Sequence, residues 1–149
     1  MRFMIIRKAD AETEAGIFPP NTEELFAAMM QYNQEMIDAG VMIGGDGLMP
    51  SSRGAKITFS GGQPTVMDGP FAEAKELIAG YTLIQVASRD EAIEWVKKWP
   101  PLDGNGEVVL ELRQVYEAED FPTDKFTPEM RELEERQRVQ EERNRAGTA

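Results

Sequence analysis

The sequence predicts an α+β domain, and three observations predict it. Two segments repeat apolar residues at helical spacing, while several shorter segments alternate apolar with polar residues, as strands with one wetted face do. Turns that contain glycine or proline separate these segments. The chain has 149 residues, which is enough to bury a hydrophobic core without disulfides or metals.

The first part of the sequence predicts a strand and a helix. Residues 3–6 form a short apolar run that is typical of a buried strand, and a polar stretch follows at 9–20. Asn21 and Glu24 have the spacing of a capping box, and apolar residues then recur at helical intervals. We therefore expect a helix that begins at Asn21 and ends at Gly40.

A strand at 41–43 then runs into a glycine-rich segment. The glycines at 44, 45 and 47 give the backbone unusual freedom, so we expect a mobile or ligand-shaped loop there. Residues 55–60 alternate apolar and polar side chains, Gly61-Gly62 predicts a turn, and 65–67 return as the partner strand of a hairpin.

The remaining elements of the domain are a strand, a helix and a strand. The β-branched and aromatic run at 81–86 predicts a strand. Ser88 and Glu91 have the spacing of a second capping box, which predicts a short helix. Residues 108–113 alternate and predict the last strand of a domain that spans residues 1–116.

This order of elements is the ferredoxin-like βαββαβ plan with an extra hairpin strand. Because several strands carry apolar residues on both sides, we expect a second copy of the chain to cover the sheet face that lacks helices, as a homodimer. Residues 117–149 form a charged C-terminal extension, which we expect to be partly helical or flexible and to dock on a protein partner.

The composition excludes several kinds of chemistry. The sequence contains no cysteine and no histidine, so thiol nucleophiles, disulfides and the commonest transition-metal ligand are absent. The formal net charge of -11 opposes binding to nucleic acid or to an anionic membrane. The N-terminus does not resemble a secretory signal, and no segment is apolar for long enough to span a membrane, so we expect a cytoplasmic protein.

The most specific motif is Asp68-Gly69-Pro70-Phe71, within residues 67–81. This segment, and the order of elements around it, resemble the DGPF-type branch of the YCII-related proteins. The resemblance implies a dimeric α/β barrel with a cleft for a small molecule. Some relatives are discussed as enzymes with a paired His and Asp in the cleft, and that pair is absent here because the chain has no histidine. DGPF-type proteins also resemble companions of extracytoplasmic-function sigma factors, which implies a regulatory role.

Two segments carry the candidate site residues. Asp68 and Glu73 are the candidate catalytic groups, because burial of crowded carboxylates can place one of them in a proton-transfer role. The candidate ligand-binding residues are Asp46, Arg53, Gly69, Pro70, Phe71, Lys75, Glu76 and Tyr81. Asp, Gly and Pro are also ordinary turn residues whose usual role is local geometry, and we favour that explanation of the motif over a catalytic one.

We expect no cofactor and no metal site. The glycine-rich segment lacks the Gly-Lys-Ser/Thr of a phosphate-binding loop, and there is no dinucleotide fingerprint. Residues 103–107 place oxygen ligands at alternate positions, but the glycine position and the later ligands do not fit a calcium loop.

Three functions remain open. The first is a homodimeric protein that binds a small molecule or acts as an accessory protein. The second is an enzyme of isomerase or lyase type, with Asp68 or Glu73 as the base and Arg53 orienting an anion. The third is a regulatory partner of a transcription factor, such as an extracytoplasmic-function sigma factor, that docks through residues 117–149.

Overall fold

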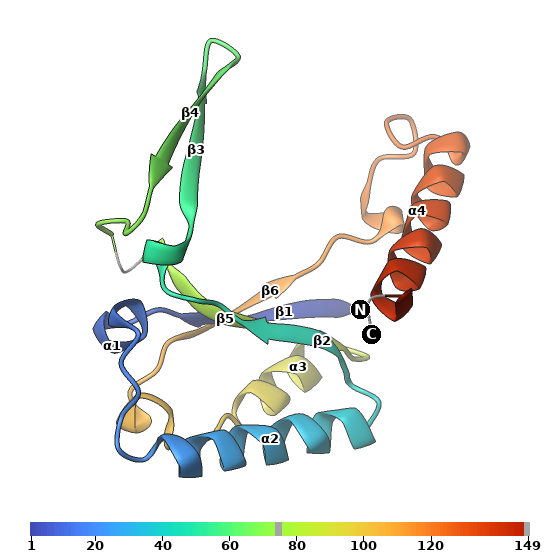
Figure 1. Ribbon diagram of the computed structural model, residues 1–149. Coiled ribbons are helices and arrows are strands. Elements are labelled where there is room, and N and C mark those ends of the chain that lie inside the picture. The colour runs from blue at the N-terminus through green and yellow to red at the C-terminus, as the bar shows by residue number, and fades with distance from the viewer. Residues whose placement is uncertain (74–75, 148–149) are drawn as a thin grey trace. The chain divides into compact units, whose positions relative to one another are not determined.

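The computed structural model describes residues 1–73 and 76–147, and it consists of two compact units, Met1–Val115 and Tyr116–Ala149 (Figure 1). In chain order, the first unit contains β1 (Arg2–Lys8), α1 (Ala11–Ala15), α2 (Thr22–Asp38), β2 (Met42–Gly47), η1 (Ser51–Arg53), β3 (Ala55–Ser60), β4 (Gln63–Asp68), β5 (Ile78–Gln85), α3 (Arg89–Val96), η3 (Asp103–Gly106) and β6 (Leu110–Gln114), where η marks a 3-10 helix.

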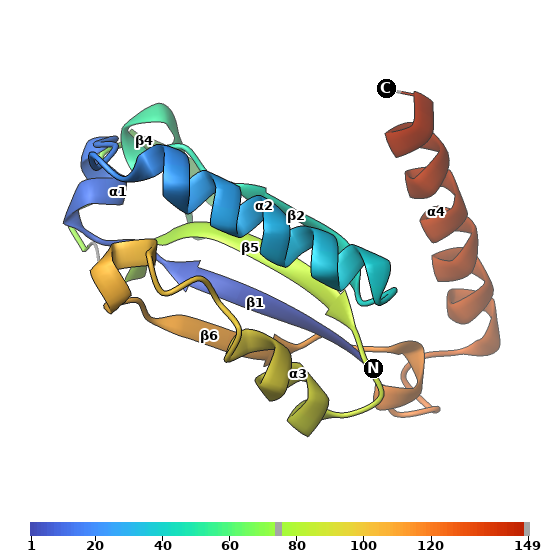
Figure 2. The same ribbon diagram turned by 90° about the horizontal axis from the view of Figure 1, so that it is seen from below.

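A four-stranded antiparallel sheet forms the centre of the first unit, with the strand order β2-β5-β1-β6. Helices α2 and α3 lie on the same face of this sheet (Figure 1 and Figure 2). An antiparallel sheet with helices packed on it confirms the predicted α+β class.

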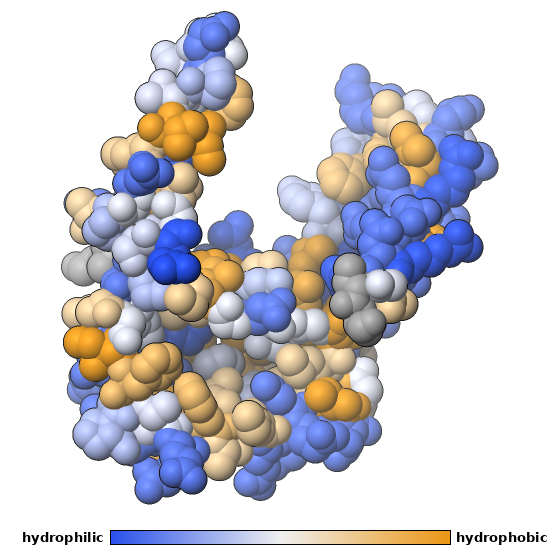
Figure 3. Space-filling model, viewed as in Figure 1, coloured by the Kyte–Doolittle hydropathy of each residue, from blue (hydrophilic) through white to orange (hydrophobic). Residues whose placement is uncertain are grey.

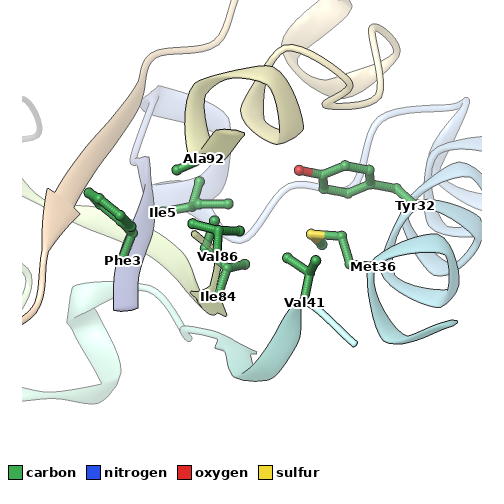
Figure 4. Close-up of a cluster of buried hydrophobic side chains, with 8 residues drawn as sticks. All are labelled: Phe3, Ile5, Tyr32, Met36, Val41, Ile84, Val86 and Ala92. Carbon is green, nitrogen blue, oxygen red and sulfur yellow. The ribbon is translucent and has the colours of Figure 1, made fainter. Parts of the chain in front are cut away.

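The hydrophobic core lies between the sheet and these helices (Figure 4). Strand alternation turns Phe3 and Ile5 of β1 toward the helices, and Ile84 of β5 joins them. Met36 of α2 and Ala92 of α3 meet this layer from the other side, and neither is accessible to solvent. The core therefore depends on long-range contacts among four separate elements.

Helix α2 begins and ends where predicted, but its N-terminal cap differs from the prediction. Gly40 has a φ of 70°, its N–H donates to Ile37 at 2.9 Å, and the N–H of Val41 donates to Met36 at 2.8 Å, which is a Schellman motif. At the other end, Asn21 is the N-cap residue, but its side chain makes no capping hydrogen bond. The predicted capping box is wrong because Asn21, at φ -91° and ψ 19°, lacks the extended backbone that aims a capping side chain.

A capping box does form one element earlier, in the stretch that predicted no helix. The N–H of Thr13 donates to Asp10 Oδ1 at 2.8 Å, and the N–H of Asp10 donates to Thr13 Oγ1 at 2.8 Å, so Asp10 caps α1. Helix α1 has 5 residues, which is too short for an apolar stripe to recur. Hydrophobic periodicity therefore gave no signal for it.

The glycine-rich segment predicted as a loop is part of strand β2. Gly45 and Gly47 pair with Thr82 and Gly80 of β5. The predicted loop is wrong because the segment pairs with β5, and Gly45 lets the two strands approach closely. A Cβ atom on Gly45 would lie 2.7 Å from the carbonyl oxygen of Tyr81.

The predicted hairpin is confirmed, but β3 and β4 form a two-stranded sheet separate from the four-stranded one. One face of this hairpin is apolar, with Ile57 opposite Val66 and Phe59 opposite Pro64. These side chains are exposed. Figure 3 shows orange, hydrophobic surface on the hairpin. The hairpin therefore does not extend the main sheet.

The second unit contains η4 (Ala118–Asp120) and the helix α4 (Pro128–Gly147). Rings of Tyr116, Phe121 and Phe126 pack in series, with centroid distances of 5.0 and 5.2 Å. The guanidinium of Arg131, in α4, lies 5.3 Å from the Phe126 ring centroid. Docking of this unit on a partner stays a prediction. Across residues 1–73 and 76–147, no helix combines the length and the apolar character that a membrane crossing needs.

Candidate functional site

A cavity of about 600 Å³ lies in the first unit, beside the hydrophobic core. Its lining comes from α1, the segment that joins α1 to α2, the first half of α2, and the β2–β5 edge of the sheet. Residues 7, 10, 48–50, 99 and 103–104 complete it.

Glycines in the sheet form the floor of this cavity. Gly47 of β2, Gly80 of β5 and Arg7 of β1 are aligned across three neighbouring strands. Two of these three positions therefore have no side chain. Gly45 lies in the next row, opposite Thr82. A Cβ atom on Gly47 would meet no heavy atom within 4 Å. The cavity therefore takes the place that the core would otherwise fill at this end of the sheet.

The walls and the rim of the cavity are mainly apolar. Leu25 and Met29 of α2 line it, together with Met42 of β2. Several large apolar side chains of the lining are exposed to solvent; these are Ile17, Phe18, Phe26, Leu48 and Met49. Exposed apolar side chains gathered around a concave surface are typical of a ligand-binding site.

A partly buried ionic cluster also lines the cavity. Arg7 donates from Nε to Asp103 Oδ2 at 3.1 Å and from Nη2 to Oδ1 at 2.7 Å, which is a bidentate pair. Its Nη1 donates to Asp10 Oδ2 at 3.0 Å and to the carbonyl of Lys8 at 2.6 Å. Trp99 Nε1 donates to Asp103 at 2.9 Å. One guanidinium thus faces two carboxylates, and the cluster has a formal charge of minus one.

Hydrogen bonding within the cluster shifts the pKa of two members toward the ionised form. The hydrogen bond to Asp103 raises the pKa of Arg7, although burial acts in the opposite direction. Burial acts to raise the pKa of Asp10, but hydrogen bonds from the Thr13 N–H and from Arg7 outweigh it, and the pKa lies below its ordinary value. Arg7 and Asp10 are therefore both charged at neutral pH.

Comparison with known proteins places the chain in a family. Residues 1–119 match the YCII-related domain family. The chain belongs to the YCII-related family. An uncharacterized protein of Rhizobium meliloti (strain 1021) is 35% identical over 97 residues, which cover 65% of this chain and 78% of that protein. The predicted resemblance to the YCII-related proteins is confirmed, and the assignment to the DGPF-type branch stays a prediction.

A solved structure has a weaker similarity to this YCII-related chain. It is 5-chloro-2-hydroxyhydroquinone dehydrochlorinase (TftG) from Burkholderia phenoliruptrix AC1100, in complex with 2,5-dihydroxybenzoquinone. The TM-score is 0.40 at 15% identity, over 81% of this chain and 100% of that chain. A similarity this low transfers no activity.

In this YCII-related chain, the Asp68-Gly69-Pro70-Phe71 motif lies outside the cavity lining and packs against Ser51. The N–H of Phe71 donates to Ser51 Oγ at 3.0 Å, and a Cβ atom on Gly69 would collide with the Ser51 carbonyl. Ser51 donates from its N–H and its Oγ to the carboxylate of Glu14, in α1, at 3.0 and 2.6 Å. The motif thus connects the base of the hairpin to α1, beside the cavity.

The other predicted site residues fall into two groups. Asp46 and Tyr81 contribute to the cavity lining and pair with each other, with the Tyr81 hydroxyl donating to Asp46 Oδ2 at 3.2 Å. Strand alternation, however, turns these two side chains away from the sheet face that carries Thr82. The predicted residues that are exposed and do not line the cavity are Arg53, Asp68, Glu73 and Glu76. Lys75 lies outside the described residues.

Sequence reasoning missed Arg7, Asp10 and Asp103. Arg7 follows Phe3 and Ile5 at alternate positions of one strand, so it shares their buried face, and a charge in phase with buried apolar residues predicts a buried partner. The turn at Asp103 drew attention only as a calcium-like loop. In the part of the chain that the structure describes, no group of three or more His, Cys, Asp or Glu side chains could hold a metal ion.

Proposed function

We propose that this protein binds a small, largely apolar organic molecule in the cavity between α2 and the glycine floor of the sheet. The observation that carries the proposal is the set Gly45, Gly47 and Gly80, which keeps side chains out of a space that the core would otherwise fill. A volume of about 600 Å³ is within the range of roughly 300–1,000 Å³ that is typical of small-molecule sites.

We also propose that the fold is ferredoxin-like and that two copies associate through the sheet face that lacks helices. The strand order β2-β5-β1-β6, with α2 and α3 on one face, supports the first part. Alternation places Met4, Ile6 and Leu83 on the other face, where they are only half-buried in the single chain. A second copy that covers them would remove apolar surface from water.

Native mass spectrometry of gently purified protein tests both proposals. We expect the wild type to retain a small molecule and Gly47→Val to lose it, because the valine side chain would occupy the cavity. The position accepts a side chain without strain, since nothing lies within 4 Å of a Cβ there. The same spectrum reports whether the chain is a dimer.

Gly147→Val is the matched control. It adds the same side chain near the end of α4, where a Cβ also meets no heavy atom within 4 Å, so it should retain the molecule. Bound mass that persists in Gly47→Val contradicts the proposed site. A wild type that carries no extra mass and takes up no apolar probe contradicts the binding function itself.

A further inference from the structure

The cavity lining carries more negative than positive charge. Among the described residues that line it, Arg7 is the one cation, and it is outnumbered by acidic residues. Asp46 turns its side chain to the other sheet face, and Glu12 is exposed. Even without those two, the cluster of Arg7, Asp10 and Asp103 keeps a formal charge of minus one. The lining therefore favours a positive group over a negative one.

Arg7 is not free to clamp an anionic ligand. Its Nε and Nη2 donate to Asp103, and its Nη1 donates to Asp10 and to the carbonyl of Lys8. A carboxylate or phosphate that recruited this guanidinium would have to break these bonds. It would also leave Asp103, which is 9% exposed, as a buried charge without its partner. Both effects oppose an anion at this end of the cavity.

Asp10 is the carboxylate of this cluster that a ligand can reach. Its side chain is 39% exposed, whereas that of Asp103 is 12% exposed. Asp10 Oδ1 accepts from the Thr13 N–H and Oδ2 accepts from Arg7, and a carboxylate has further lone pairs to offer. Asp10 lines the same cavity as the apolar side chains of Leu25 and Met29.

Resting on the proposed binding function, we propose that the ligand is a small amphipathic amine. Its apolar body fills the space over the glycine floor, and its protonated nitrogen donates a hydrogen bond to Asp10. The ammonium group neutralises the surplus negative charge of the cluster without disturbing the Arg7–Asp103 pair. Such a ligand contacts the apolar walls of the cavity and hydrogen-bonds with its charged end.

Three probes of one shape and different charge test this class. They are 1-naphthylmethylamine, which is protonated at neutral pH, the neutral 1-naphthylmethanol, and the anionic 1-naphthoate, each titrated into the full chain by calorimetry at physiological salt. We expect the amine to bind about tenfold more tightly than the alcohol, through a charge-assisted hydrogen bond, and the carboxylate to bind most weakly.

Two variants separate a site from general attraction to an acidic protein. Asp10→Asn removes the charge and keeps a good N-cap residue, so α1 should persist, and the preference for the amine should fall below about threefold. Asp90→Asn removes the same charge from an exposed position in α3 and should leave the preference unchanged. Circular dichroism of both variants checks the fold.

The outcomes distinguish this inference from the binding function. If all three probes bind with equal affinity and Gly47→Val abolishes binding, the cavity is a binding site but its ligand is not an amine. Carboxylate binding as tight as amine binding also overturns the inference. If no probe binds at millimolar concentration, the inference and the binding function both fall. Amine selectivity that survives Gly47→Val overturns the assignment to this cavity.

Discussion

Replacing Asp103 with alanine should destabilise the protein by about 3–5 kcal/mol, the usual cost of breaking a buried ion pair from one side. Asp103 accepts hydrogen bonds from Arg7 Nε and Nη2 and from Trp99 Nε1, at 3.1, 2.7 and 2.9 Å. Arg7 is 8% exposed, so water cannot replace the lost carboxylate. Asp10 would remain as the one carboxylate bonded to this guanidinium.

Urea unfolding followed by far-UV circular dichroism measures this loss. In a double-mutant cycle, Arg7→Met together with Asp103→Ala should cost about 1–3 kcal/mol less than the sum of the two single variants. The exposed pair of Lys97 and Glu94, at 2.7 Å, is a matched control whose coupling should stay below about 1 kcal/mol. If the buried pair couples no more strongly than this control, the ionic cluster does not stabilise the fold as argued.

Two further predictions concern buried and closely packed positions. Burial raises the pKa of Tyr32 from 10.0 to about 12, so the folded state holds its proton more tightly than the unfolded state does. This proton linkage contributes roughly 3 kcal/mol to the free energy of unfolding below the unfolded pKa, and the contribution is lost as pH rises toward about 12. In unfolding titrations, the stability of the wild type should therefore fall more steeply at alkaline pH than that of Tyr32→Phe. Gly45→Ala should cost more than about 1 kcal/mol, because its Cβ would lie 2.7 Å from a backbone oxygen, whereas Gly47→Ala should be neutral or stabilising in the same unfolding assay.

Hydrophobic periodicity predicted most elements, but residue spacing did not predict which caps form. Asn21 and Ser88 each have an acidic residue three positions later, yet only Ser88 accepts a capping hydrogen bond, from the Glu91 N–H at 3.1 Å. The backbone explains the difference: Ser88 is extended, at φ -151° and ψ 163°, whereas Asn21 is not. The conformation before a helix is set by the chain that leads into it, which spacing does not describe.

The candidate site was less accessible to sequence reasoning because its polar centre joins distant residues. Arg7 and Asp103 are 96 residues apart, and no local pattern connects them. The sequence did draw attention to Asp46 and to the glycines beside it, and the structure places that segment at the cavity. What the sequence did not reveal is that these glycines pair with β5, so that missing side chains become a floor.

Gly47 is the residue whose identity the fold alone does not explain. Gly40 has a φ of 70°, and Gly45 would bring a Cβ against backbone, so both positions require glycine for conformational reasons. Gly47 has neither constraint: its φ is not positive, and nothing lies within 4 Å of a Cβ there. A side chain at this position would restrict the unfolded chain, and that effect stabilises a protein. A glycine at this position lowers stability and keeps the binding cavity open.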